Sequence, residues 1–104
     1  MGINVAWVNE GHESLEQIAD FGQVLTGLAM SRWPSLSETV CLQFVDPWGD
    51  AVFNQTQIPI LLNELRVEAS ATEESTDREH LEKVIELVER SVDQIHTYIK
   101  FIGD

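Results

Sequence analysis

The stretch "DREHLEKVIELVERSVDQIHTYIKFI", residues 77–102, decides the fold. Its first part repeats apolar side chains at steps of three and four, which is the spacing of one buried face of an α-helix. That face consists of Leu81, Val84, Ile85, Val88 and Val92. Residues 95–102 instead alternate with a period of two and are rich in β-branched and aromatic residues, which is typical of a strand. We therefore predict a helix over 77–93 that is followed by a strand over 95–102.

The segments before this stretch show the same two patterns. Residues 3–8, 39–45 and 51–53 are short, apolar and bounded by polar turn residues, so we predict a strand at each. Residues 57–69 return to helical spacing, and this predicts a second helix. Its buried face consists of Ile58, Leu61, Leu62, Leu65 and Ala69.

Residues 14–29 are the least regular part of the chain. Their apolar side chains follow helical spacing, but Gly22 and Gly27 each cost about 1 kcal/mol in a helix interior. We predict a helix over 14–29, with a helix that breaks near Gly22 as the alternative. Residues 31–38 are predicted to form a loop, because Pro34 disfavours a helical conformation at the residue before it.

These elements predict an α+β fold with the order β-α-β-β-α-α-β. A sheet of about four strands, with helices packed mainly on one face, is the simplest arrangement that buries every apolar face. With 104 residues and 43% apolar content, the chain has the length and composition of one domain, residues 1–104.

The net charge is the strongest global signal. Eighteen acidic residues oppose six basic ones, giving −12, whereas a small domain usually carries a net charge of about 2 to 8 in magnitude. Such a surface disfavours binding to nucleic acid or to an anionic membrane. No apolar run approaches the ~20 residues of a membrane span, the start of the chain lacks a secretory signal, and the single Cys41 excludes an internal disulfide. We therefore expect a cytoplasmic protein.

The turn "FVDPWGDAVFN", residues 44–54, has a structural and a chemical interpretation. In the structural one it is a hairpin turn, in which Asp46 caps the backbone and Gly49 takes a left-handed conformation. In the chemical one Asp46 and Asp50, joined by Asp104, supply hard oxygen ligands for Mg²⁺ or Ca²⁺. His96 could then meet Asp50 or Asp104 across the sheet. The structural interpretation accounts for the turn without a metal ion.

This turn also carries a resemblance. Together with the following "QIPILLNEL" and the closing "HTYIKFIGD", it resembles a group of small uncharacterised bacterial proteins that share a "DPYGDTVFN"-like turn and a C-terminal "YLKFxGD"-like strand. The chain departs from that pattern at Trp48, where the group often has Tyr, and at Ala51, where it often has Thr. The resemblance covers residues 40–104 and implies a mixed α and β fold with no assigned catalytic residue. Orphan proteins of this sort are frequent among mobile gene cassettes and toxin-neutralising partners.

An acidic stripe on the helix over 77–93 is the main candidate for a binding surface. Its members recur at steps of three and four and are Glu79, Glu82, Glu86, Glu89 and Asp93. Lys83 and Arg90 dilute the stripe through the i,i+4 pairs Glu79–Lys83 and Glu86–Arg90. An exposed Trp48, with Trp33 in its loop, would supply the aromatic anchors that protein interfaces favour.

We expect from these features a non-enzymatic protein-binding module that takes a basic protein, in the manner of an immunity protein or inhibitor, and needs no cofactor. Two alternatives stay open. One is a small metal-dependent hydrolase centred on Asp46 and Asp50, and the other is a small-ligand-binding protein. A homodimer would form through the C-terminal strand if that strand lies at the edge of the sheet.

Overall fold

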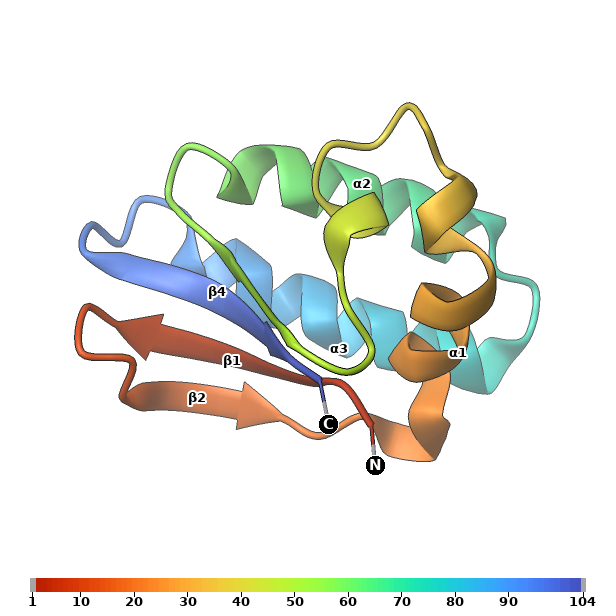
Figure 1. Cartoon of the computed structure of the whole chain (residues 1–104), viewed down its shortest axis with the longest axis horizontal. Helices are drawn as coiled ribbons and strands as arrows, with labels where there is room; N and C mark the ends of the chain where they lie inside the picture. Colours follow the sequence, from red (N-terminus) through yellow and green to blue (C-terminus); the bar gives the residue numbers. More distant parts are fainter. Residues whose placement is uncertain (1, 104) are drawn as a thin grey trace.

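The computed structural model describes residues 2–103 and contains a four-stranded antiparallel sheet in the order β2-β1-β4-β3. The strands are β1 (Asn4–Asn9), β2 (Ser14–Ile18), β3 (Asp50–Phe53) and β4 (Thr97–Ile102). Figure 1 shows the sheet as one layer, with α3 (Ser75–Ser91) behind it, α2 (Ile58–Ala71) above it in the view and α1 (Val24–Ser31) at one end. The predicted α+β class, with four strands and helices on one face, is confirmed.

The core lies between the sheet and the two long helices. In β1 and β4 every second residue points inward, so Val5 lies opposite Phe101 and both are fully buried. Phe53 of β3 meets the Phe101 ring edge-on, with ring centroids 5.7 Å apart. The helices close this layer with buried apolar side chains, among them Leu61, Leu65, Leu81, Val84 and Val88. The helical spacing over 57–69 and 77–93 and the strand pattern over 95–102 therefore predicted the right elements.

The prediction of a helix over the whole of 14–29 is wrong in its first part. Residues Ser14–Ile18 form β2, an edge strand that pairs with β1 through Val5↔Ile18 and Trp7↔Glu16. The side chain of Asn9 builds the connecting turn, because its Oδ1 accepts the N–H groups of Gly11 and Glu13 at 2.9 and 3.0 Å. The helix begins only after Gly22, which has a left-handed φ of 65°. The alternative of one helix that breaks near this glycine is therefore also wrong, because a strand and not a helix precedes it.

The predicted strand over 39–45 is also wrong. Its central residues form a 3-10 turn, Leu42–Phe44. The backbone N–H groups of Val40, Cys41 and Leu42 all donate to the carboxylate of Glu64, at 2.7, 3.2 and 3.0 Å. A side chain on α2 thus provides the hydrogen bonds that a neighbouring strand would have provided.

Residues 46–49 therefore form a turn that leads into β3, and they do not join two strands of a hairpin. Asp46 does cap this turn, since its Oδ1 accepts the N–H of Trp48 at 2.8 Å. Gly49 is not left-handed, but a Cβ there would lie 2.8 Å from Asp46 Oδ2, so space rather than φ favours glycine. The N–H of Gly103 donates to the carbonyl of Gly49 at 2.7 Å, which brings the turn and the end of β4 together.

This junction predicts a large difference between two glycines. In Gly103→Ala the new Cβ would lie 2.5 Å from the backbone oxygens of Asp46 and Gly49, so we expect the free energy of unfolding to fall by about 1–3 kcal/mol. In Gly27→Ala the Cβ meets nothing within 4 Å and the residue lies inside α1, where alanine favours the helix, so we expect a gain of about 1 kcal/mol. Urea denaturation measures both, and equal effects would contradict the close approach at Gly103.

The position of β4 changes the expectation for a homodimer. β4 lies between β1 and β3 and is hydrogen-bonded on both sides, so it has no free edge. The edges of the sheet are β2 and β3. Pairing of two copies through the C-terminal strand is therefore excluded by its place in the sheet.

Candidate partner-binding surface

The acidic stripe lies on the outer face of α3. Glu74 caps this helix, because its carboxylate accepts the N–H groups of Thr76 and Asp77, and the bond from Asp77 is the main reason that the pKa of Glu74 is lowered. The inward face of α3 is buried against the sheet and α2. The outward face exposes Glu79, Glu82, Glu86 and Glu89, and Asp93 follows the end of the helix, also exposed.

Basic side chains neutralise little of this stripe. Arg90 does not pair with Glu86 but reaches Glu16 of β2, at 2.5 Å, and no ion pair joins Glu79 to Lys83 within 4 Å. Glu89 is paired with Arg66 of α2 at 3.1 Å. Both i,i+4 pairs expected from the sequence are thus wrong. In the part of the chain that the structure describes, Glu79, Glu82 and Glu86 have no ion-pair partner, and we call these three residues the acidic row.

Most of the other basic side chains are also engaged away from the row. Arg32 pairs with Glu68 at 2.8 Å, and Lys100 lies 3.6 Å from Asp50. The guanidinium of Arg78 donates to the carbonyl of Thr72 at 3.4 Å. Lys83 is exposed on α3 between Glu82 and Glu86 and offsets part of the charge, so the row keeps a smaller net negative charge for a partner.

The structure does not bring Trp48 and the acidic row together. Trp48 is 63% exposed, in the turn before β3, whereas Trp33 is fully buried and cannot be an anchor. α2 contacts both α3 and the 3-10 turn Leu42–Phe44, so it lies between the row and the segment that leads to Trp48. In Figure 1 the 3-10 turn Leu42–Phe44 lies at the front of the molecule, and α3 lies at the back, behind the sheet. A partner on the row would reach the exposed side of α2 before it reached Trp48.

The carboxylates proposed as metal ligands are engaged separately. Asp46 caps its own turn, and Asp50 faces Lys100. Asp104 lies outside the described residues. His96 does not meet Asp50, because its Nδ1 lies 2.6 Å from Glu10 Oε1 at the opposite end of β4. Within residues 2–103, no three His, Cys, Asp or Glu side chains are grouped so that they could hold a metal ion.

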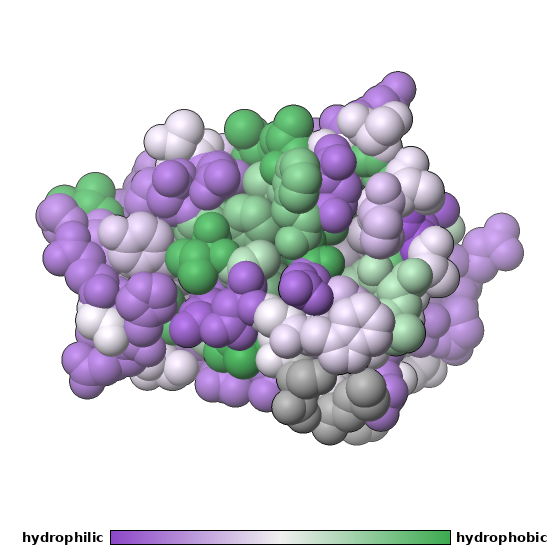
Figure 2. Space-filling view, in the orientation of Figure 1, coloured by the Kyte–Doolittle hydropathy of each residue, from purple (hydrophilic) through white to green (hydrophobic). Residues whose placement is uncertain are grey.

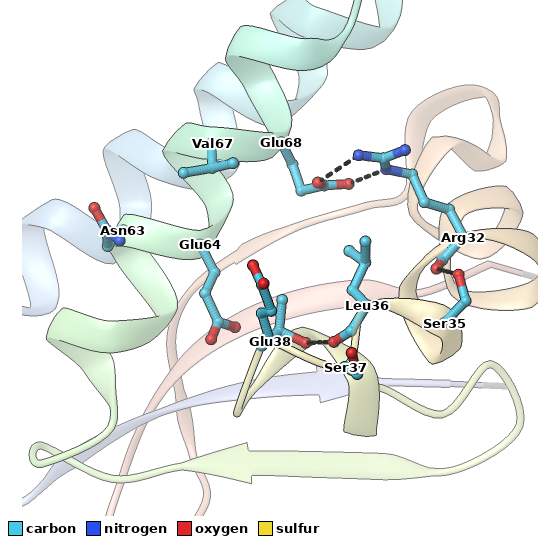
Figure 3. Close-up of a pocket in the computed structure, with 10 residues that line it drawn as sticks. Arg32, Ser35, Leu36, Ser37, Glu38, Asn63, Glu64, Val67 and Glu68 are labelled. Atoms are coloured by element: carbon cyan, nitrogen blue, oxygen red, sulfur yellow. Dashed lines mark hydrogen bonds and ion pairs between the residues drawn. The ribbon is translucent and has the colours of Figure 1, made fainter.

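A cavity beside α2 was missed by the sequence analysis. It has a volume of about 450 Å³ and lies between α2 and the loop after α1 (Figure 3). Its walls are Arg32, Ser35, Leu36, Ser37, Glu38, Thr39, Asn63, Glu64, Val67 and Glu68. The spacing of Glu64 and Glu68, one helical turn apart beside a buried apolar face, was the only sequence signal for it.

The two glutamates on α2 hold the loop wall of this cavity. Glu68 is buried and accepts both Arg32 Nε and the indole Nε1 of Trp33, at 2.8 and 3.0 Å. Glu64 accepts the N–H groups of Val40, Cys41 and Leu42, at the start of the 3-10 turn Leu42–Phe44. Burial and the charge of Glu64 raise the pKa of the neighbouring Cys41 thiol to about 11, so this side chain is a protonated core residue at neutral pH.

A second buried acidic group lies at the start of α1. The carboxylate of Asp20 accepts N–H groups from Ile3, Leu25 and Thr26 and the hydroxyl of Thr26, at 2.7 to 3.0 Å. His80 of α3 lies beside it, with Nε2 3.6 Å from Asp20 Oδ1. The ring of His80 is buried and this nitrogen has no hydrogen-bond partner among the described residues. Asp20 thus joins the first strand, the first helix and α3.

His80 predicts a pH dependence of stability. Burial lowers its pKa from the ordinary value of 6.5, and the charge of Asp20 opposes this only in part, with smaller effects from Lys83 and Asp77. The unfolded chain therefore binds the proton of His80 more readily than the folded chain does. The contribution of neutral His80 to the free energy of unfolding is complete above pH 6.5 and is lost as the pH falls through the folded-state pKa. We expect the free energy of unfolding to fall over this range in the native chain and to fall less in His80→Gln. The control is His96→Gln, on an exposed ring, and an unchanged slope in His80→Gln would contradict the prediction.

The open face of the sheet is the other exposed surface. Figure 2 shows apolar side chains gathered in the middle and upper part of this face, over β3 and the segments above it, with polar side chains around them. Among the described residues, four of the nine large apolar side chains that are exposed fall between residues 40 and 52, and they are Val40, Phe44, Trp48 and Val52. None of the helices within residues 2–103 is long and apolar enough to cross a membrane.

Comparison with protein-family models, with curated proteins and with solved structures found no match for this chain. Function must therefore be argued from the geometry.

Proposed function

We propose that the chain is a non-catalytic protein-binding module of the cytoplasm, which takes a basic partner on the outer face of its two long helices. The observation that carries this proposal is the acidic row on α3, which has no ion-pair partner among the described residues. Like charges that the fold leaves unpaired raise the electrostatic cost of the folded state, and a partner of opposite charge removes that cost.

The size of the surface suits a protein partner. α3 has 17 residues and is therefore about 25 Å long. A typical protein interface covers about 800 Å² on each partner, which is a patch with sides close to that length. Next to the row, α2 exposes Ile60 and Val67, which supply apolar contact area inside a charged rim.

The charge explains how such a partner would be found. With a net charge of −12, the chain attracts a basic protein over distances of about 10 Å at moderate ionic strength and speeds the encounter. A strongly acidic surface of this kind suits an immunity protein or inhibitor that must bind a basic target quickly. Residues 40–104 resemble a group of small uncharacterised bacterial proteins, and orphan proteins of this sort are frequent among toxin-neutralising partners, which is consistent with the same class.

The test is affinity capture from the native host at low salt, followed by reconstitution with the purified partner. Two double variants remove the same charge from different places: Glu82→Gln/Glu86→Gln on the row, and Glu10→Gln/Glu13→Gln in the turn between β1 and β2. We expect a basic partner whose Kd rises about tenfold in the row variant and less than about twofold in the turn variant. Recovery of no specific basic protein, or equal losses in both variants, would overturn the proposal.

A further inference from the structure

We infer that the cavity beside α2 receives the guanidinium group of an arginine side chain. This inference deepens the proposed function, since it names the group by which the partner would be recognised. It rests on the residues that line the cavity, and none of the acidic row is among them.

The lining of the cavity favours a cation that only donates hydrogen bonds. Glu38, Glu64 and Glu68 supply three carboxylates, against the single guanidinium of Arg32. The hydroxyls of Ser35 and Thr39 donate to the carbonyls of Arg32 and Leu36, at 2.8 and 2.7 Å. The oxygen of Ser35 is left as an acceptor, whereas that of Thr39 already accepts the N–H of Gln43 at 3.2 Å. A guanidinium group has five N–H donors and no acceptor, so it complements such a lining.

Only part of this negative charge is already used by the chain. The oxygens of Glu68 are bound by Arg32 and Trp33, and those of Glu64 by backbone N–H groups. The Glu38 carboxylate has no hydrogen bond or ion pair within the described part of the chain, and Figure 3 shows it pointing toward α2. Glu38 is therefore the group that a bound guanidinium would pair with. Glu64 and Glu68 line the cavity around the bound group and are held in place by their own hydrogen bonds.

The cavity also suits the rest of an arginine side chain. Its volume of about 450 Å³ lies within the ~300–1,000 Å³ range of small-ligand sites. Leu36 and Val67 provide apolar wall for the methylene stem while the charged head lies among the oxygens. Val67 also belongs to the exposed side of α2, so a partner seated across α2 and α3 would present its arginine here.

The probe is N-acetyl-arginine amide, and the control probe is N-acetyl-citrulline amide, which has the same shape without the charge. We expect amide NMR signals of residues 35–39 and 63–68 to shift with saturation in the first titration and to stay in place in the second. Glu38→Gln should weaken binding of the arginine probe by about fivefold or more, because it removes the free carboxylate. Glu13→Gln removes the same charge from the exposed turn between β1 and β2 and should change binding of this probe by less than about twofold.

Three results would overturn the inference: shifts spread along α3 as well, equal weakening by Glu38→Gln and Glu13→Gln, or equal binding of the citrulline probe. Glu38 is exposed, so loss of folding does not confuse the comparison. The capture experiment does not use these probes. A basic partner that depends on the acidic row, together with no site-specific arginine binding, would refute the cavity alone and leave the proposed function standing.

Discussion

Replacing Asp20 by alanine is expected to lower the free energy of unfolding by about 3–5 kcal/mol, which is a large part of the stability of a domain this size. The side chain is 1% exposed and accepts four hydrogen bonds. Without it, the N–H groups of Ile3, Leu25 and Thr26 lose their acceptor. A buried donor that is left unsatisfied costs about 1–3 kcal/mol.

The matched control for this change is Asp46→Ala. Asp46 also caps a turn, but it is exposed and its carboxylate accepts one backbone N–H, so we expect a loss of about 1 kcal/mol or less. Chemical denaturation followed by tryptophan fluorescence measures both variants. A loss of under about 1 kcal/mol in Asp20→Ala would show that the start of the chain and α1 do not depend on this carboxylate.

Glu68→Ala is expected to have an effect of similar size, a loss of about 3–5 kcal/mol. Glu68 is 4% exposed, and its removal leaves the buried indole N–H of Trp33 without an acceptor and Arg32 without its ion pair. The loop after α1 would then separate from α2. Because Trp33 is fully buried in the native chain, its fluorescence emission should shift to longer wavelength in the variant.

Arg32→Ala separates the two contacts of Glu68. The Arg32 side chain is 48% exposed, so the water that surrounds it weakens the ion pair, and we expect a much smaller loss than in Glu68→Ala. The Trp33 hydrogen bond stays in this variant. Equal losses in Arg32→Ala and Glu68→Ala would mean that the indole bond contributes nothing, contrary to our account.

The sequence predicted those elements whose pattern is complete within the element itself. The apolar residues of α3 repeat over several helical turns, and those of β4 alternate along the whole strand. Both elements were predicted close to their observed bounds. Residues 39–45 carry the composition of a strand, but their N–H groups bind Glu64, which is more than twenty residues away. No local pattern reveals such a partner.

The same distance between partners explains what was missed around the binding surface. The acidic stripe was visible because it lies on one helix, whereas the cavity depends on a loop that Glu64 and Glu68 hold from α2. The helical spacing of Leu15 and Ile18 was misleading. β2 is an exposed edge strand, so its sequence does not have to alternate between apolar and polar residues. Asp20 gave no signal at all, since its four hydrogen bonds come from two separate segments, Ile3 before β1 and residues 25–26 of α1.

The most direct test of the acidic row as a docking surface is amide-resolved NMR of the labelled chain in complex with the basic partner captured at low salt. We predict the largest signal changes along residues 79–89 of α3 and 60–67 of α2, and loss of these changes as salt is raised. Changes centred instead on the open face of the sheet, around β3 and Trp48, and insensitive to salt, would contradict the account.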